Sequence, residues 1–231
     1  MIGDAIRADI EAYAVRRSDN PLFKMTEEGA VTKAMVIQYL ANLRFMHAST
    51  PTHCRRASDR AMDLGIPKLA AYFEEKIAEE MGHEAWADRD MAKLRPEAKV
   101  EPNSAVTESI RSLVALIERT IDANPAFYLA YIAFSEYITV ILGPAWLDLL
   151  SERCGIPHTS MTAIGNHVEL DREHAEEVFG CIDDFVTDPK QIGVMRELLR
   201  NVVRHFDGFC AEIAASSESS RRQRVAHVSA A

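Results

Sequence analysis

Apolar residues recur at helical spacing along most of the chain, and no stretch shows the strict alternation that marks a half-buried strand. Sequences rich in proline, glycine and asparagine, such as "LGIP" and "DANP", separate the periodic segments. The pattern predicts seven helices, over about 2–18, 32–65, 67–94, 105–122, 125–153, 158–181 and 188–214.

These helices follow one another without repeats or a long internal linker, which indicates a single all-α domain over residues 1–214. The second helix is expected to bend near Pro51, because proline lacks a backbone donor. The remaining residues, 215–231, are rich in serine, arginine and alanine and have no apolar periodicity. We expect this tail to be disordered.

The stretch "PAFYLAYIAFSEYITVILGPAWL" is long and apolar enough to span a bilayer. Its only charge is Glu136, near the middle, where a carboxylate costs roughly 2.5–3.5 kcal/mol in a membrane. Amphipathic neighbours can cover such a helix, so a buried central helix is the better interpretation. Glu136 must then be protonated, or meet a metal ion or a buried Lys or Arg.

Net charge and cysteine content indicate which partners and which cellular compartment the protein is expected to have. The chain has 231 residues and a net charge of -9, which argues against nucleic acid or an anionic membrane as a partner. The N-terminus lacks the basic start and apolar block of a signal peptide, so we expect mature, cytoplasmic sequence. The cysteines are far apart, which is typical of reduced thiols: Cys54, Cys154, Cys181 and Cys210.

Three polar residues share one stripe of the helix over 158–181. With His167 at 0°, Asp171 lies at about 40° and His174 at about -20°, on the side that carries Val178. A carboxylate and two imidazoles are costly to bury, and a cation compensates that cost. The alternative is a set of core polar residues satisfied by neighbours. Because the backbones of the outer two are roughly 10 Å apart, two ions fit the trio better than one.

The helix over 67–94 offers a second pair of ligands. Glu80 and His83 lie one turn apart on its apolar side, at the Glu-x-x-His spacing of di-iron sites in helical bundles. Glu79 points close to the same direction, and Asp90 could either support a ligand histidine or be structural. Oxygen and nitrogen ligands without thiolate suit iron or manganese.

Three segments together, "EEMGHEAWADRDM", "AFSEYITVILG" and "HVELDREH", resemble the heme-oxygenase-like di-iron oxidases and oxygenases. The resemblance covers about residues 30–185 and implies a seven-helix bundle like heme oxygenase and thiaminase II. It also implies two Fe(II) ions, with Mn possible, that activate dioxygen to oxidise an amino-acid-like or fatty-acid-like molecule. By the same resemblance the chain is expected to be a homodimer, and the ligands would be Glu80, His83, Glu136, His167, Asp171 and His174.

The sequence departs from this family at one position. Many members place a carboxylate seven residues before the ligand histidine, and here that residue is Lys76. We expect Glu80 to substitute for it, with Glu79 as the second choice. We expect the Lys76 side chain to extend its charge into solvent.

Two other functions stay open. A relative on the same fold without a metal would need a nucleophilic cysteine in the pocket, as in thiaminase II, or a His/Tyr/Arg-lined pocket, as in pyrroloquinoline-quinone synthase; only Cys181 is a candidate cysteine. The second open function is that of an iron-binding protein that catalyses no reaction. Several residues could line a pocket but are expected to be ordinary core: Phe45, His47, His53, Tyr128, Tyr131 and Tyr137.

Overall fold

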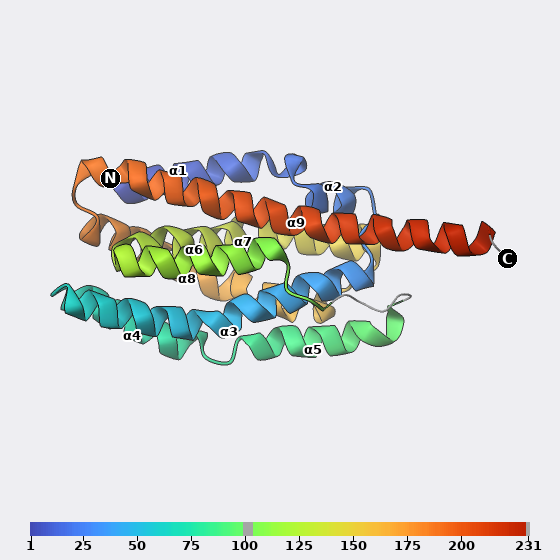
Figure 1. Ribbon diagram of the computed structural model, residues 1–231, viewed down its shortest axis with the longest axis horizontal. Helices are drawn as coiled ribbons and strands as arrows, with labels where there is room; N and C mark the ends of the chain where they lie inside the picture. The colour runs from blue at the N-terminus through green and yellow to red at the C-terminus, as the bar shows by residue number, and fades with distance from the viewer. Residues whose placement is uncertain (99–103, 230–231) are drawn as a thin grey trace.

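The computed structural model describes residues 1–98 and 104–229, with side chains described as far as residue 216, and it contains no strand within those ranges. The helices lie along one long axis as a bundle (Figure 1). They are α1 (Ile2–Val15), α2 (Pro21–Glu27), α3 (Lys33–Asp63), α4 (Pro67–Glu80), α5 (Glu84–Leu94), α6 (Glu108–Ala123), α7 (Pro125–Cys154), α8 (Thr162–Phe185) and α9 (Ile192–Ser229).

The all-α class is confirmed, but the described chain has nine α-helices where seven were expected. One addition is α2, which Asn20 starts by accepting hydrogen bonds from the backbone N–H groups of Leu22 and Phe23. The other arises because the helix predicted over 67–94 is two helices, α4 and α5. Gly82 lies between them with φ of 91°, a left-handed conformation that ends a helix.

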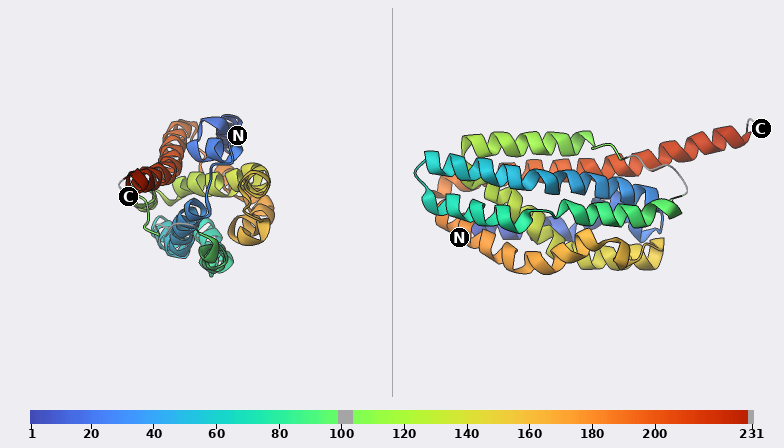
Figure 2. Two further views of the ribbon diagram at one scale, coloured as in Figure 1. Left: turned by 90° about the vertical axis from the view of Figure 1, so that its right-hand side faces the viewer. Right: turned by 90° about the horizontal axis from the view of Figure 1, so that it is seen from below.

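The second predicted helix is confirmed, since α3 is one helix from Lys33 to Asp63 with Pro51 inside it. The C-terminal boundary differs from expectation. α9 continues to Ser229, past the domain boundary expected at residue 214, and reaches beyond the other helices in the views of Figures 1 and 2. Because the side chains after residue 216 lie outside the described part, the disordered tail stays a prediction.

Helix α7 is the apolar centre of the bundle, in contact with α1, α2, α3, α6, α8 and α9. It is the one helix of the described chain long and apolar enough to cross a membrane, and 67% of its most apolar window is buried by the protein itself. This burial supports a core helix. α7 also approaches α8 closely, since a Cβ on Gly143 would lie 2.5 Å from Cγ2 of Val168.

Candidate metal centre

Potential ligand atoms from separate helices meet in the interior of the bundle. Among the described residues, two groups have ligand atoms within 4.8 Å of one another. One consists of Glu80, His83 and His167, and the other of Glu80, Glu136 and His174. Glu80 is common to both groups. Five of the six predicted ligands are therefore brought together, and Glu80, not Glu79, is the carboxylate that belongs to the groups.

The turn between α4 and α5 positions the first group. Glu80 ends α4 and His83 precedes α5, so the two do not share a continuous helix as predicted. The left-handed Gly82 turns the chain so that Nδ1 of His83 still lies 3.3 Å from Oε2 of Glu80. Trp86 stacks on the His83 ring with a centroid distance of 4.1 Å and fixes its plane.

Asp90 organises the start of α8. This fully buried carboxylate accepts hydrogen bonds of 2.8 Å from Oγ1 of Thr162 and from the backbone N–H of Ala163. The carbonyl of Ala163 in turn lies 2.6 Å from Nδ1 of His167. Asp90 is therefore structural: its hydrogen bonds are with Thr162, Ala163 and Lys93 and not with a ligand histidine, which answers the question left open by the sequence.

The contact with the Ala163 carbonyl assigns the tautomer of His167. A carbonyl oxygen can only accept, so Nδ1 of the neutral ring must carry the hydrogen. The lone pair then belongs to Nε2, the nitrogen left to bind a cation. Backbone carbonyls orient metal-binding histidines in this way in many proteins.

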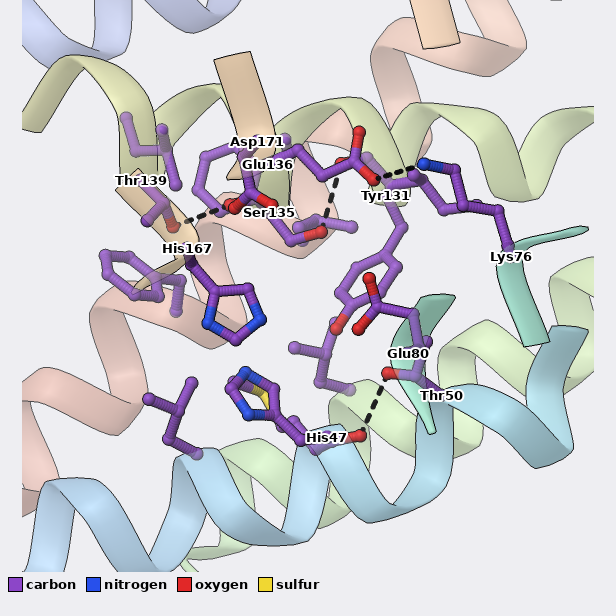
Figure 3. Close-up of a pocket in the computed structure, with 18 of the residues that line it drawn as sticks. His47, Thr50, Lys76, Glu80, Tyr131, Ser135, Glu136, Thr139, His167 and Asp171 are labelled. Carbon is purple, nitrogen blue, oxygen red and sulfur yellow. Dashed lines mark hydrogen bonds and ion pairs between the residues drawn. The ribbon is translucent and has the colours of Figure 1, made fainter. Parts of the chain in front are cut away.

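Lys76 differs most from the prediction. Its side chain is not in solvent: the residue is 2% exposed, and Nζ lies 3.4 Å from Oε1 of Glu136. It also lies 3.0 Å from Oε2 of Glu79 and 3.6 Å from Oε2 of Glu177. Burial alone would lower the pKa of Lys76, but the carboxylates, Glu136 foremost, raise it. The amine is therefore charged, and Figure 3 shows it directed at Glu136.

Asp171 lies beside the second group and belongs to neither. Its Oδ1 is 3.7 Å from Nδ1 of His174, and Nε2 of the same ring is 3.5 Å from Oε2 of Glu79. Glu79 is partly exposed and contacts this ring from the solvent side. Asp171 is 2% exposed and faces the same interior as Glu136 (Figure 3).

The donor set fits a metal because several of its buried atoms lack hydrogen bonds. Four such atoms belong to the predicted ligands: Nδ1 of His83, Oε2 of Glu136, Oδ1 of Asp171 and Nδ1 of His174. Burial raises the pKa of Asp171, and it raises the pKa of Glu136 although the neighbouring Lys76 ammonium opposes that shift. A buried polar atom without a partner is costly, and a cation would relieve that cost for both carboxylates.

A cavity of about 110 Å³ opens beside these residues. One side is polar and includes Lys76, Glu80, Glu136, His167 and Asp171, while the rest is mainly aromatic and aliphatic (Figure 3). A second cavity of about 60 Å³ adjoins it and shares part of its lining. The shared residues are Tyr39, Ile138, Thr139, Ile164 and Phe206.

The cavity lining shows which of the residues expected to be ordinary core reach the pocket. Tyr128 and Tyr131 line it, whereas the hydroxyl of Tyr137 donates to Glu11 at the surface. Phe45 and His53 are not among its lining residues. These differences arise because a helix presents residues three or four apart to the same side, and the sequence does not show which side faces the cavity.

Two residues of α3 at the cavity differ from expectation: His47 was expected to be ordinary core, and Cys54 was not a candidate for the pocket. His47, on α3, packs its ring 4.5 Å from the His167 ring, and its Nδ1 is buried without a partner. Burial lowers the pKa of His47 to about 3, so this ring is neutral. Cys54, also on α3, lines the cavity, whereas the expected Cys181 does not. The sequence did not place either side chain at the cavity, because the stretch of α3 around them mixes polar and apolar residues.

Comparisons with known proteins support the fold without giving a function. No family model and no curated protein matches the sequence. Among solved structures, a protein of unknown function with a heme oxygenase-like fold from Shewanella denitrificans OS217 superposes with a TM-score of 0.82 at 17% identity, covering 94% of each chain.

Two further structures are similar. A CADD-like protein of unknown function from Nostoc punctiforme PCC 73102 matches with a TM-score of 0.69 at 15% identity, covering 93% of this chain and 97% of that one. A TenA homolog from Pseudomonas syringae pv. tomato str. DC3000 matches with a TM-score of 0.64 at 13% identity, covering 92% and 90%. The chain therefore has a heme-oxygenase-like fold.

Proposed function

We propose that the protein is a non-heme di-iron oxidase or oxygenase. The observation that carries this proposal is the position of Glu80, which is common to two buried groups of carboxylate and imidazole ligands. Two Fe(II) ions, or Mn(II) ions in their place, would lie between α4, α7 and α8. The sequence resemblance to di-iron oxidases, the fold and the ligand geometry support the same assignment.

Iron bound there would supply the activation of dioxygen, and the protein residues would bind and shield the ions. Glu80 would contact both ions, with His83 and His167 on one side and Glu136 and His174 on the other. Asp171 would be the remaining carboxylate of the second position, after a small movement of its side chain. The aromatic and aliphatic walls of the cavity would exclude water from the reaction.

The cavity favours a substrate with an apolar body. Its lining away from the ligands is aromatic and aliphatic, and the adjoining cavity extends it toward Trp146. Of the two substrate classes implied by the resemblance, this shape supports the fatty-acid-like one over a small amino acid. Ile164 lines both cavities, so Ile164→Phe should block the substrate without touching a ligand.

Metal-free catalysis is the weaker alternative. Cys54 does line the cavity, as a thiaminase-II-like nucleophile would, but burial raises the pKa of its thiol to about 12. A thiol with that pKa is protonated at neutral pH and a poor nucleophile. Storage of iron without turnover would not require the apolar cavity beside the ligands.

Anaerobic titration with Fe(II), followed by air and a panel of fatty acids and amino acids, tests the proposal. We expect about two irons per chain and dioxygen consumption that depends on an apolar carboxylic acid. Ile164→Phe should keep the iron and lose the substrate-dependent consumption. No specific iron binding would rule the proposal out, and iron uptake without substrate-dependent consumption would identify a store.

We also propose that the protein acts in the cytoplasm as a homodimer, with dioxygen and a small molecule as its partners and without nucleic acid or membrane. The acidic net charge of -9 supports the absence of nucleic acid as a partner, and the burial of α7 supports the absence of a membrane. Light scattering on the purified protein tests the dimer.

A further inference from the structure

Lys76 occupies a position where a charge is costly. It lies on α4 one turn before Glu80 and is 2% exposed. Its ammonium is surrounded by Glu79 on its own helix, Glu136 on α7 and Glu177 on α8. The Tyr72 ring lies 5.8 Å from Nζ, so little but these carboxylates compensates the buried charge.

The ammonium engages only one of the two ligand groups. Glu136, its partner at 3.4 Å, belongs to the group with Glu80 and His174. The other group does not contain Glu136, and none of its residues is paired with Lys76. A divalent ion at the second group would have to share Glu136 with an ammonium of like charge.

Two carboxylates on the solvent side of the site can hold the Lys76 ammonium when Glu136 binds an ion. Glu79 and Glu177 have side chains that are 38% and 46% exposed, on the solvent side of the site. Lys76 can keep both contacts when Glu136 turns to an ion. His174 also contacts Glu79, so the second group and the lysine compete for two of the same carboxylates.

We propose that Lys76 makes the two positions load in order. The first ion binds at Glu80, His83 and His167, while Lys76 neutralises Glu136 in place of a second ion. The second ion binds more weakly, because it must displace the ammonium from Glu136 toward Glu79 and Glu177. This inference rests on the proposed metal centre and adds that a residue of this chain sets the difference in affinity between the two positions.

Anaerobic calorimetric and spin-resonance titration of the full chain with Mn(II) alone tests this order. We expect wild-type protein to bind one ion with the spectrum of an isolated Mn(II), and a second at least about tenfold more weakly. Lys76→Met keeps most of the length of the side chain and removes its charge. In that variant the second ion should bind roughly tenfold or more tightly than in wild type, with a spin-coupled spectrum at lower Mn(II).

Lys68→Met is the matched control, since Lys68 is an exposed lysine on the same helix. It should leave both affinities unchanged. Circular dichroism verifies the fold of each variant, and Lys76→Gln is a second neutral substitution should the methionine disturb packing. If neither variant folds, the wild-type isotherm decides, because two equal and tight sites overturn the inference.

The outcomes separate the two proposals. Equal affinities in wild type, or neutral Lys76 variants that bind like wild type, would overturn the ordering role of Lys76 and leave the di-iron centre intact. A wild-type protein that binds no Mn(II) and no Fe(II) would instead remove the metal centre, and this inference with it.

Discussion

Nδ1 of His83 lies 3.3 Å from Oε2 of Glu80 across a turn that separates two helices. The contact is made possible by Gly82, whose φ of 91° is strained for any residue with a side chain. The first ligand group therefore depends on a backbone conformation as well as on its side chains.

Gly82→Ala should lower the free energy of unfolding by about 1 kcal/mol, since space around the new Cβ is open and only the backbone conformation is penalised. It should also weaken binding of the first ion. Gly180→Ala, inside α8 with open space around its Cβ, should instead stabilise by about 0.5–1 kcal/mol. Urea denaturation of both variants gives the comparison. Equal effects would show that the turn is unstrained.

Glu80→Ala should eliminate binding of both ions, because Glu80 belongs to both ligand groups. Glu79→Ala, one residue away, should retain the first ion, since Glu79 belongs to neither ligand group and contacts only Lys76 and His174 from the solvent side. Metal analysis after anaerobic loading measures the difference. Loss of metal in both variants, or in neither, would contradict the role assigned to Glu80.

Asp171→Ala should prevent tight binding of the second ion and leave the helical fold largely intact. The carboxylate is buried, and its Oδ1 has no hydrogen-bond partner, so its removal breaks no bond of that atom. Iron content measures binding of the second ion, and circular dichroism measures whether the helical fold is retained. Two-iron occupancy equal to wild type would exclude Asp171 as a ligand.

Gly143→Ala should destabilise the protein by roughly 1–3 kcal/mol, since its Cβ would lie 2.5 Å from Cγ2 of Val168. The double variant with Val168→Ala should recover part of this loss, because the clashing methyl is gone. Thermal denaturation of the two single variants and the double variant measures the coupling. Simple additivity would mean that α7 and α8 move apart without penalty.

Glu212 gives a pH-dependent contribution to stability. Burial would raise the pKa of its carboxyl, but hydrogen bonds from Ser109 and Glu108 outweigh it and lower the pKa. A carboxylate with a lowered pKa stabilises the fold above its unfolded pKa, and the contribution is lost as pH falls through the folded value. Glu212→Gln should therefore cost about 1 kcal/mol at pH 7 and much less near pH 3. Urea denaturation at the two pH values tests this, and an equal cost at both would contradict it.

Helical periodicity predicted the fold class and most of the candidate ligands from local information. The stripe with His167, Asp171 and His174 could be predicted because an α-helix repeats at a fixed angle, so apolar neighbours identify the buried side. Glu136 stood out because it is the only charge in a long apolar run. Both arguments depend on neighbours in the chain alone.

Only the tertiary structure decided which residues meet across helices. The break at Gly82 depends on a backbone dihedral, and the Lys76–Glu136 pair joins residues 60 positions apart. The same local sequence allows a lysine side chain to extend into water or to lie buried. Which of the two occurs depends on the carboxylates that the other helices bring near it. For the same reason only the folded chain shows that His47 and Cys54 line the cavity. Periodicity indicates which side of a helix is buried, whereas the packing of all helices determines what that side contacts.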